Sequence, residues 1–228
     1  MAHGDVRSVP ARRAANGKST PANGRTAVRE RNEAKILKAA EAVFARKGFS
    51  GASTAEIARK AKVPKPNLHY YFRTKRLLYA AVLDRILEIW LDALDEIRPE
   101  AEPADALARY VVRKLESSRI LPEPSRLWAM ELIGGARHVQ PFLKGRLRQL
   151  VLQKSEVIRG WIEAGKIDEI DPAHLLFGLW ALTQTYADFA AQISAVLGKD
   201  RLDDAVFAAA TRTATQLVLR GVAVRSGR

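Results

Sequence analysis

Apolar residues recur at intervals of three and four along most of the chain, and no segment alternates apolar and polar residues over any length. The first of these stripes consists of Ile36, Leu37, Ala40, Val43 and Phe44. This spacing places apolar side chains on one face of an α-helix, whereas a half-buried strand needs alternation at every second residue. The chain is therefore predicted to be all-α, with no sheet.

Three short helices are predicted close together in the N-terminal third. The first ends at Gly48, and the second extends from a capping position at Ser53 to about Ala61. The third spans about Lys65 to Phe72, with Pro66 in its first turn, where a missing N–H costs little. Two short helices joined by a tight turn are typical of a helix-turn-helix module.

The rest of the chain is predicted to form a larger helical bundle. A long amphipathic helix from Arg76 to Ile97 follows the module directly, and further helices are expected at residues 104–120, 124–136, 141–164, 172–196 and 202–222. Between residues 172 and 193 the only charged side chain is Asp188, so the last two helices need burial on most sides. We expect a homodimer in which this pair meets its symmetry mate as a four-helix bundle; the alternative is the interior of a single-chain bundle.

Positive charge is concentrated in the first third of the chain. Residues 1–75 hold 17 Lys and Arg against 5 Asp and Glu, a net of +12, while the whole chain has a net charge of +13. Such an asymmetry favours a nucleic-acid partner for this part, although a basic tail with a solvated surface would also produce it. Residues 1–25 lack periodicity and are predicted to be a disordered basic arm that either contacts DNA or is an inert tail.

These patterns define three expected regions: a disordered basic arm at 1–25, a helix-turn-helix domain at 26–75, and a helical effector-binding and dimerisation domain at 76–228. The chain has no cysteine, no Gly-rich phosphate loop and no nucleophile motif, and its 4 histidines lack metal-ligand spacing. We therefore expect no enzyme, no catalytic or metal site and no cofactor. Neither a membrane span nor a signal peptide is expected, so the predicted location is the cytoplasm.

The stretch from Lys35 to Leu91 resembles the TetR family of transcription regulators. The residues that carry the likeness are Ile36-Leu37-Lys38-Ala39-Ala40, Phe44, Gly48-Phe49, Thr54-Ala55-Glu56-Ile57-Ala58, Val63-Pro64-Lys65-Pro66-Asn67-Leu68-His69-Tyr70-Tyr71-Phe72, Lys75, Leu78 and Tyr79. Lys62 and Pro64 stand where many members have Gly and Ser. The resemblance implies a homodimer that binds a near-palindromic operator in double-stranded DNA, with half-sites about one turn or more apart.

The third predicted helix carries the candidate base-reading residues. It would enter the major groove, where Asn can read adenine and Lys can donate to guanine. The resemblance further implies that a tyrosine and a lysine near the end of this helix touch the DNA backbone, and the N-terminus of the second helix presents free N–H groups to phosphate. The candidate DNA-binding residues are thus Thr54, Lys65, Pro66, Asn67, His69, Tyr70 and Lys75. Asn67 and His69 as plain surface residues are the alternative.

Three later stretches resemble the pyrimidine-responsive RutR branch of the family. They are Tyr110…Lys114-Leu115-Glu116, Ser125-Arg126-Leu127-Trp128-Ala129-Met130-Glu131 and Trp180…Thr183-Gln184…Tyr186-Ala187-Asp188-Phe189-Ala190. This likeness implies a regulator, most simply a repressor, that senses a pyrimidine such as uracil or thymine and controls nucleobase catabolism genes. The alternative is a TetR-type repressor of efflux or lipid genes that senses a hydrophobic ligand.

The candidate ligand-binding residues are polar groups on helices that are otherwise apolar. Trp180, Gln184 and Asp188 are spaced to share one helix face, and a buried amide and carboxylate need partners, which a planar heterocycle with N–H and C=O groups would provide. Lys114 and Arg126 are candidate donors to ligand carbonyls. Alternatively, Gln184 and Asp188 bridge the dimer or pair with these cations, and Arg126 pairs locally with a carboxylate such as that of Glu131.

Overall fold

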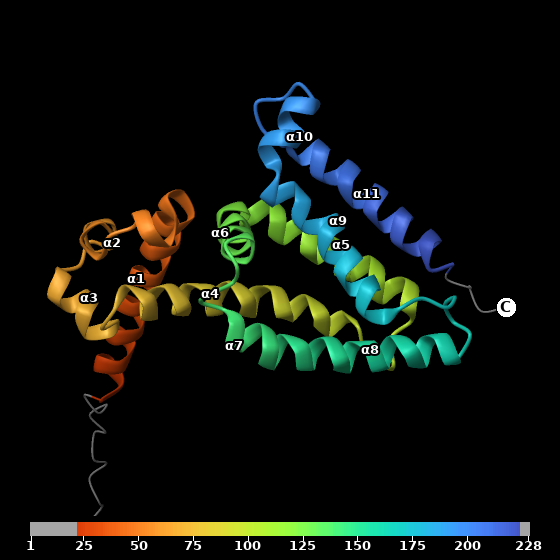
Figure 1. Cartoon of the computed structure of the whole chain (residues 1–228), viewed down its shortest axis with the longest axis horizontal. Coiled ribbons are helices and arrows are strands. Elements are labelled where there is room, and N and C mark those ends of the chain that lie inside the picture. Colours follow the sequence, from red (N-terminus) through yellow and green to blue (C-terminus); the bar gives the residue numbers. More distant parts are fainter. Residues whose placement is uncertain (1–21, 224–228) are drawn as a thin grey trace, which may run out of the picture.

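The computed structural model describes residues 22–223, which are helical or connect helices and contain no strand. Its elements are α1 (Ala22–Gly51), α2 (Thr54–Ala61), α3 (Lys65–Tyr71), α4 (Lys75–Leu91), η1 (Asp92–Glu96), α5 (Pro103–Ile120), α6 (Pro122–Ile133), α7 (Gln140–Phe142), η2 (Leu143–Leu147), α8 (Arg148–Glu163), α9 (Pro172–Asp188), α10 (Ala190–Val196) and α11 (Asp204–Gly221). Figure 1 shows α1–α3 gathered at one end, α4 leading away from them, and α5–α11 forming the larger lobe at the other end. The all-α prediction, with a three-helix N-terminal domain, is confirmed.

The helices of the N-terminal module follow the sequence pattern closely. Ser53 caps α2 by accepting a hydrogen bond from the Glu56 backbone N–H at 3.2 Å. Gly48 interrupts α1 with a φ of 66°, a left-handed value that suits glycine. Helix α1 begins at Ala22, inside the range expected for the basic arm, and the rest of that arm, residues 1–21, lies outside the described residues.

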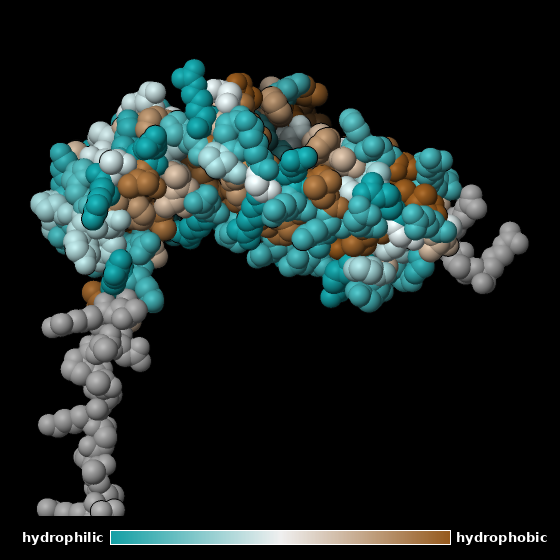
Figure 2. All heavy atoms as spheres, turned by 60° about the horizontal axis from the view of Figure 1, so that its bottom comes forward, coloured by the Kyte–Doolittle hydropathy of each residue, from teal (hydrophilic) through white to brown (hydrophobic). Residues whose placement is uncertain are grey.

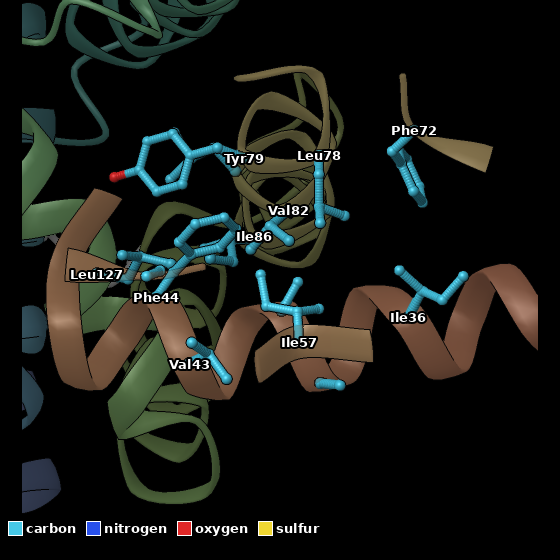
Figure 3. Packing of buried hydrophobic residues seen from close by; sticks show 14 of the residues in the cluster. Ile36, Val43, Phe44, Ile57, Phe72, Leu78, Tyr79, Val82, Ile86 and Leu127 are labelled. Atoms are coloured by element: carbon cyan, nitrogen blue, oxygen red, sulfur yellow. The ribbon is translucent and has the colours of Figure 1, made fainter. Parts of the chain in front are cut away.

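Two hydrophobic cores organise the described chain. The first joins α1–α3 to α4 and α6, and Figure 3 shows Phe44 beside Leu127 at one end of this core and Ile36 near Phe72 at the other. The second lies in the larger lobe and is built from η1, α5, α8, α9 and α11. Helix α4 contributes residues to both cores, so it connects the two lobes through packing as well as through the chain.

The long helix predicted from Arg76 to Ile97 is shorter than expected. Helix α4 ends at Leu91 and the chain tightens into the 3₁₀ turn η1, a common way to close a helix. The end of this turn is held by Lys154 of α8, whose Nζ donates to the carbonyl of Ile97 at 3.0 Å. The helix that leads from α1–α3 into the larger lobe is therefore α4, and it ends at Leu91.

Three other predicted helices also differ from the structure. The helix expected at 124–136 ends at Ile133, because Gly134 and Gly135 follow and Gly135 has a φ of 92°. The helix expected at 141–164 contains the π-helical turn η2, and the one expected at 172–196 is broken at Phe189 between α9 and α10. Periodicity alone does not reveal such local changes of helix type.

Helices α9 and α11, which the sequence predicts to need burial on most sides, are only partly buried within one chain. Leu176, Leu179 and Val218 face the core, whereas Phe177 is 47% and Leu217 is 56% exposed. Figure 2 shows several hydrophobic side chains reaching the surface over the larger lobe. None of the helices in residues 22–223 combines the length and apolar character that crossing a bilayer requires.

Candidate nucleic-acid interface and candidate ligand cavity

Helix α3 is short; one face packs into the first core, and the opposite face is exposed to solvent. Leu68 is fully buried in the first core, and Phe72 at the C-cap is buried beside it. The carbonyl of Pro64 accepts hydrogen bonds from the N–H groups of Asn67 at 3.0 Å and Leu68 at 3.2 Å, which closes the first turn. The structure thus brings Lys65, Pro66 and Asn67 together on the outside, and leaves His69 half-buried.

The turn between α2 and α3 has an unusual residue at its tightest point. Lys62 adopts a left-handed conformation with a φ of 56°, and its N–H bonds back to the carbonyls of Ala58 and Arg59. Glycine, which the resemblance described above implies at this position, reaches this conformation without the strain that a Cβ introduces. The lysine keeps the turn geometry but carries that strain.

The candidate backbone-contacting residues lie in different surroundings. Tyr70 is 74% exposed at the end of α3, and Thr54 is the half-buried first residue of α2. Lys75 is held within the module: its Nζ donates to the carbonyl of Ala52 at 3.0 Å and lies 4.6 Å from the centre of the Phe49 ring. A phosphate contact by Lys75 remains a prediction, and in this structure the side chain steadies the loop that precedes α2.

A salt-bridge cluster ties α1 to α2. Glu56 accepts hydrogen bonds from Lys47 at 2.6 Å and Arg46 at 2.7 Å. The hydrogen bond from Lys47 lowers the pKa of the Glu56 carboxyl, so the group stays ionised. Because the arginine and lysine are exposed, this cluster chiefly fixes the direction of α2 and adds little stability.

A small cavity of about 100 Å³ lies where the two cores meet. Its wall combines side chains of the first core, such as Trp90 and Trp128, with side chains of the second, such as Leu94 and Tyr110. The lining residues are Leu87, Trp90, Leu91, Leu94, Tyr110, Lys114, Trp128, Leu132, Leu143, Leu147, Trp180 and Gln184. A molecule bound here would touch side chains of both cores, from α4, α5, α6 and α9.

The ammonium group of Lys114 is the most unusual feature of this cavity. The residue is only 3% exposed, and its Nζ lies 4.6 Å from the centre of the Trp90 ring. In the described part of the chain its neighbours are the Trp90 ring and, at longer range, the charge of Asp188. Burial lowers the pKa of Lys114 to about 8, although the charge of Asp188 opposes that shift. An ammonium held among apolar walls is costly to the protein and well suited to an acceptor on a ligand.

Other polar groups converge on the same space. Gln184 and Trp180, one turn apart on α9, line the cavity beside Lys114 of α5. The Tyr110 hydroxyl is also buried there; burial raises the pKa of this group, and the Trp180 indole N–H opposes the shift. The cavity therefore offers a cation, an amide, a hydroxyl and an indole among apolar walls.

Two candidate ligand residues lie outside this cavity. Asp188 and Arg126 line a separate open cleft between α1, α6 and the end of α9. The Asp188 carboxylate accepts a hydrogen bond from Ser125 at 2.5 Å, and burial raises its pKa while Ser125, Lys114 and Arg126 act against this. Asp188 is the last residue of α9. Trp180 and Gln184, earlier in the same helix, line the cavity, whereas Asp188 lies beyond it.

The structure adds residues that the sequence did not single out as ligand-binding. Trp90, Tyr110 and Trp128 form much of the wall, yet in the sequence they belong to ordinary apolar helix stripes. Glu131, which the sequence suggested as a partner for Arg126, instead accepts hydrogen bonds from Tyr79 and His138. No cluster of three or more His, Asp and Glu side chains in the described part of the chain could hold a metal ion.

Comparison with known proteins places this arrangement in a family. The model for bacterial regulatory proteins of the TetR family matches residues 36–82, and the model for the YcdC-like protein C-terminal region matches residues 83–225. The chain belongs to the TetR family. It is a DNA-binding transcription regulator and not an enzyme.

Individual relatives agree with this assignment. The chain is 43% identical over 190 residues to the HTH-type transcriptional regulator RutR of Escherichia coli K12, a match covering 83% of this chain and 90% of that protein. It is 29% identical to the HTH-type transcriptional repressor NicS of Pseudomonas putida, with 85% and 93% covered. Among solved structures, the transcriptional regulator SCO4942 of Streptomyces coelicolor superposes with a TM-score of 0.64 at 26% identity, covering 84% of this chain and 98% of that one.

Proposed function

We propose that this regulator senses a pyrimidine such as uracil or thymine in the cavity around Lys114 and controls genes of nucleobase catabolism from the cytoplasm. The observation that carries the proposal is the Lys114 ammonium, which lies against the Trp90 ring at the wall of the cavity and is only 3% exposed. The likeness to RutR, at 43% identity over most of the chain, supports the same ligand class.

The cavity suits one small planar ring. Its volume of about 100 Å³ is comparable with that of apolar cavities of roughly 150 Å³ that hold benzene in other proteins. Trp90, Trp128 and Trp180 offer flat surfaces for stacking. Lys114 would donate to a ring carbonyl, and Gln184 can both donate to and accept from the alternating C=O and N–H groups of a pyrimidine.

A hydrophobic effector is the second candidate, because six leucines also line the cavity: Leu87, Leu91, Leu94, Leu132, Leu143 and Leu147. These side chains would accept a compact lipophile, but a lipophile offers no acceptor to the Lys114 ammonium. Polarity of the ligand therefore separates the two candidates.

We infer that the regulator acts as a homodimer whose two DNA-binding modules meet a near-palindromic operator. The exposed apolar face of α9 and α11 supports this: Phe177, Gly178 and Leu217 lie on it, beside a groove of about 230 Å³. A second copy of the pair would cover this face as a four-helix bundle. The ligand would favour a spacing of the two modules that suits adjacent grooves poorly, and DNA would favour the other spacing.

Intrinsic tryptophan fluorescence gives a direct test, since three of the 4 tryptophans line the cavity. Uracil and thymine should quench this fluorescence saturably, and a thermal-shift series should show them raising the melting temperature. Lys114→Met and Gln184→Leu should each weaken uracil binding by about tenfold or more. Lys144→Met is the matched control, because Lys144 is exposed and lies outside the cavity. Response to alkyl or aromatic hydrocarbons but not to uracil or thymine would refute the pyrimidine proposal.

A further inference from the structure

A buried polar network joins α4 to α6 and to the segment that follows α6. The Glu131 carboxylate, 8% exposed, accepts hydrogen bonds from the Tyr79 hydroxyl of α4 at 3.1 Å and from the His138 backbone N–H at 2.8 Å. The ring Nδ1 of His138 lies 3.0 Å from the same carboxylate. We call these three side chains the Tyr79–Glu131–His138 latch.

One side of the latch reaches the DNA-binding surface. The His138 ring lies 4.5 Å from the Phe49 ring, centre to centre, and Phe49 in turn lies beneath the Lys75 ammonium. Lys75 holds the carbonyl of Ala52, immediately before α2. A movement of His138 would therefore shift the N-terminus of α2 through these contacts. This end of the helix presents free N–H groups to a phosphate.

The other side of the latch reaches the ligand cavity. Glu131 lies on α6 between Trp128 and Leu132, and both of these residues line the cavity. Tyr79 packs edge-on against Phe44 with a centroid distance of 4.8 Å, while its hydroxyl points away from the apolar residues around it (Figure 3). The hydrogen bond between the Tyr79 hydroxyl and the Glu131 carboxylate thus links the first core to α6, the helix that contributes Trp128 and Leu132 to the cavity.

We propose that Glu131, held by Tyr79 and His138, is a positioning residue that transmits ligand binding to the DNA-binding module. This inference rests on the proposed function, because it assigns a route to the ligand response of the same cavity. A buried carboxylate with specific donors has few alternative arrangements, so α6 and the module move together while the latch is closed. When the latch is broken, the protein still folds, the cavity still binds its ligand and the module still binds DNA, but ligand binding no longer changes DNA affinity.

The test uses the full chain and a duplex that the protein itself selects from a random-sequence library. For the wild type, saturating uracil or thymine should change the DNA dissociation constant by at least about fivefold, within the usual range of allosteric coupling. Tyr79→Phe keeps the ring and removes the hydroxyl; it should lower this factor below about twofold while the uracil dissociation constant changes by less than about threefold. Tyr186→Phe is the matched control, since Tyr186 lies on α9 away from the latch, and it should keep the wild-type factor.

Two further measurements separate loss of the latch from general damage to the fold. Glu131→Gln combined with Tyr79→Phe should lose no more coupling than either change alone, because both act through one bond. Hydrogen exchange without ligand should speed up together at residues 52–57 and 131–139 in Tyr79→Phe, and not in Tyr186→Phe. A Tyr79→Phe variant with unchanged coupling overturns the latch. If neither pyrimidine changes the DNA affinity of the wild type, the proposed function fails. The latch is then tested by hydrogen exchange alone: independent exchange of residues 52–57 and 131–139 in Tyr79→Phe would refute it.

Discussion

The candidate DNA-binding surface and the ligand cavity hold polar side chains in opposite ways. On α3, Lys65 and Asn67 project into solvent, and burial of the neighbouring Leu68 fixes their direction. In the cavity, Lys114 is held inside the protein among apolar side chains, and burial lowers its pKa to about 8. The first arrangement suits a large, charged, hydrated partner, and the second suits a small molecule that replaces water completely. Each site thus offers polar groups to a different partner: Lys65 and Asn67 are available to DNA, and Lys114 is available to a small ligand.

Salt should separate the two sites most strongly. Contacts with roughly six to ten phosphates would lower DNA affinity by about 10³ to 10⁵ between 50 and 200 mM salt, because bound counterions are released. Uracil affinity should change by less than about threefold over the same range, since uracil is neutral and Lys114 is largely buried, where salt screens charges poorly. Fluorescence anisotropy for DNA and tryptophan quenching for uracil measure both. A flat salt profile for DNA would contradict the assignment of the basic module.

The pH dependence of stability should reveal the buried lysine. The pKa of Lys114 is about 8 in the folded chain against 10.5 in its ordinary state, so between these values the unfolded chain binds the extra proton. Stability should therefore rise with pH from about 8 towards 10, by up to roughly 3 kcal/mol at the full shift. Denaturant titrations of the wild type against Lys114→Met measure this rise as a difference. Parallel curves for the two proteins would show that the lysine is not desolvated.

Substitution of a single base-reading candidate should affect DNA only. Asn67→Ala should weaken binding to the selected duplex by about 1–3 kcal/mol and relax specificity at one base pair. Because Asn67 is exposed, the melting temperature and uracil affinity should stay unchanged. Gln153→Ala, an exposed amide on α8, serves as the control. Equal affinities of Asn67→Ala and wild type across all duplexes would leave Asn67 as a plain surface residue.

The sequence predicted these two regions unequally well. Around α3 the signals are local: Ser53 caps α2, Pro66 lies in the first turn of α3, and Gly48 ends the regular part of α1. Each acts within a few residues, so spacing along the chain is enough to place it. The outward direction of Lys65 and Asn67 then follows from the buried Leu68.

The cavity depends instead on how distant helices meet. The spacing of Trp180 and Gln184 puts them on one face of an apolar helix, where a buried amide needs a partner, and Lys114 is predicted only as a candidate donor from another helix. Arg126 and Asp188 had the same appearance in the sequence but line another cleft, since α9 ends at Asp188 and α10 turns away. The Tyr79–Glu131–His138 latch joins residues up to 59 positions apart, and no periodicity within one helix reports such a contact.

The smallest expected effect concerns the turn between α2 and α3. Lys62→Gly should stabilise the protein by up to about 1 kcal/mol, because Lys62 holds a left-handed conformation that glycine reaches more easily. Chemical denaturation measures the gain, with Lys60→Gly within α2 as a control that should lose stability. A loss of stability at both positions would mean that Lys62 makes compensating contacts.

The central claim is that the cavity and the DNA-binding surface are coupled, and reciprocity tests it most directly. Uracil affinity should be measured by tryptophan quenching for the free protein and for the protein saturated with its selected duplex, at one salt concentration. The account predicts that DNA weakens uracil binding by the same factor by which uracil weakens DNA binding, roughly 5- to 150-fold. Identical uracil affinities in the free and DNA-bound protein would contradict it.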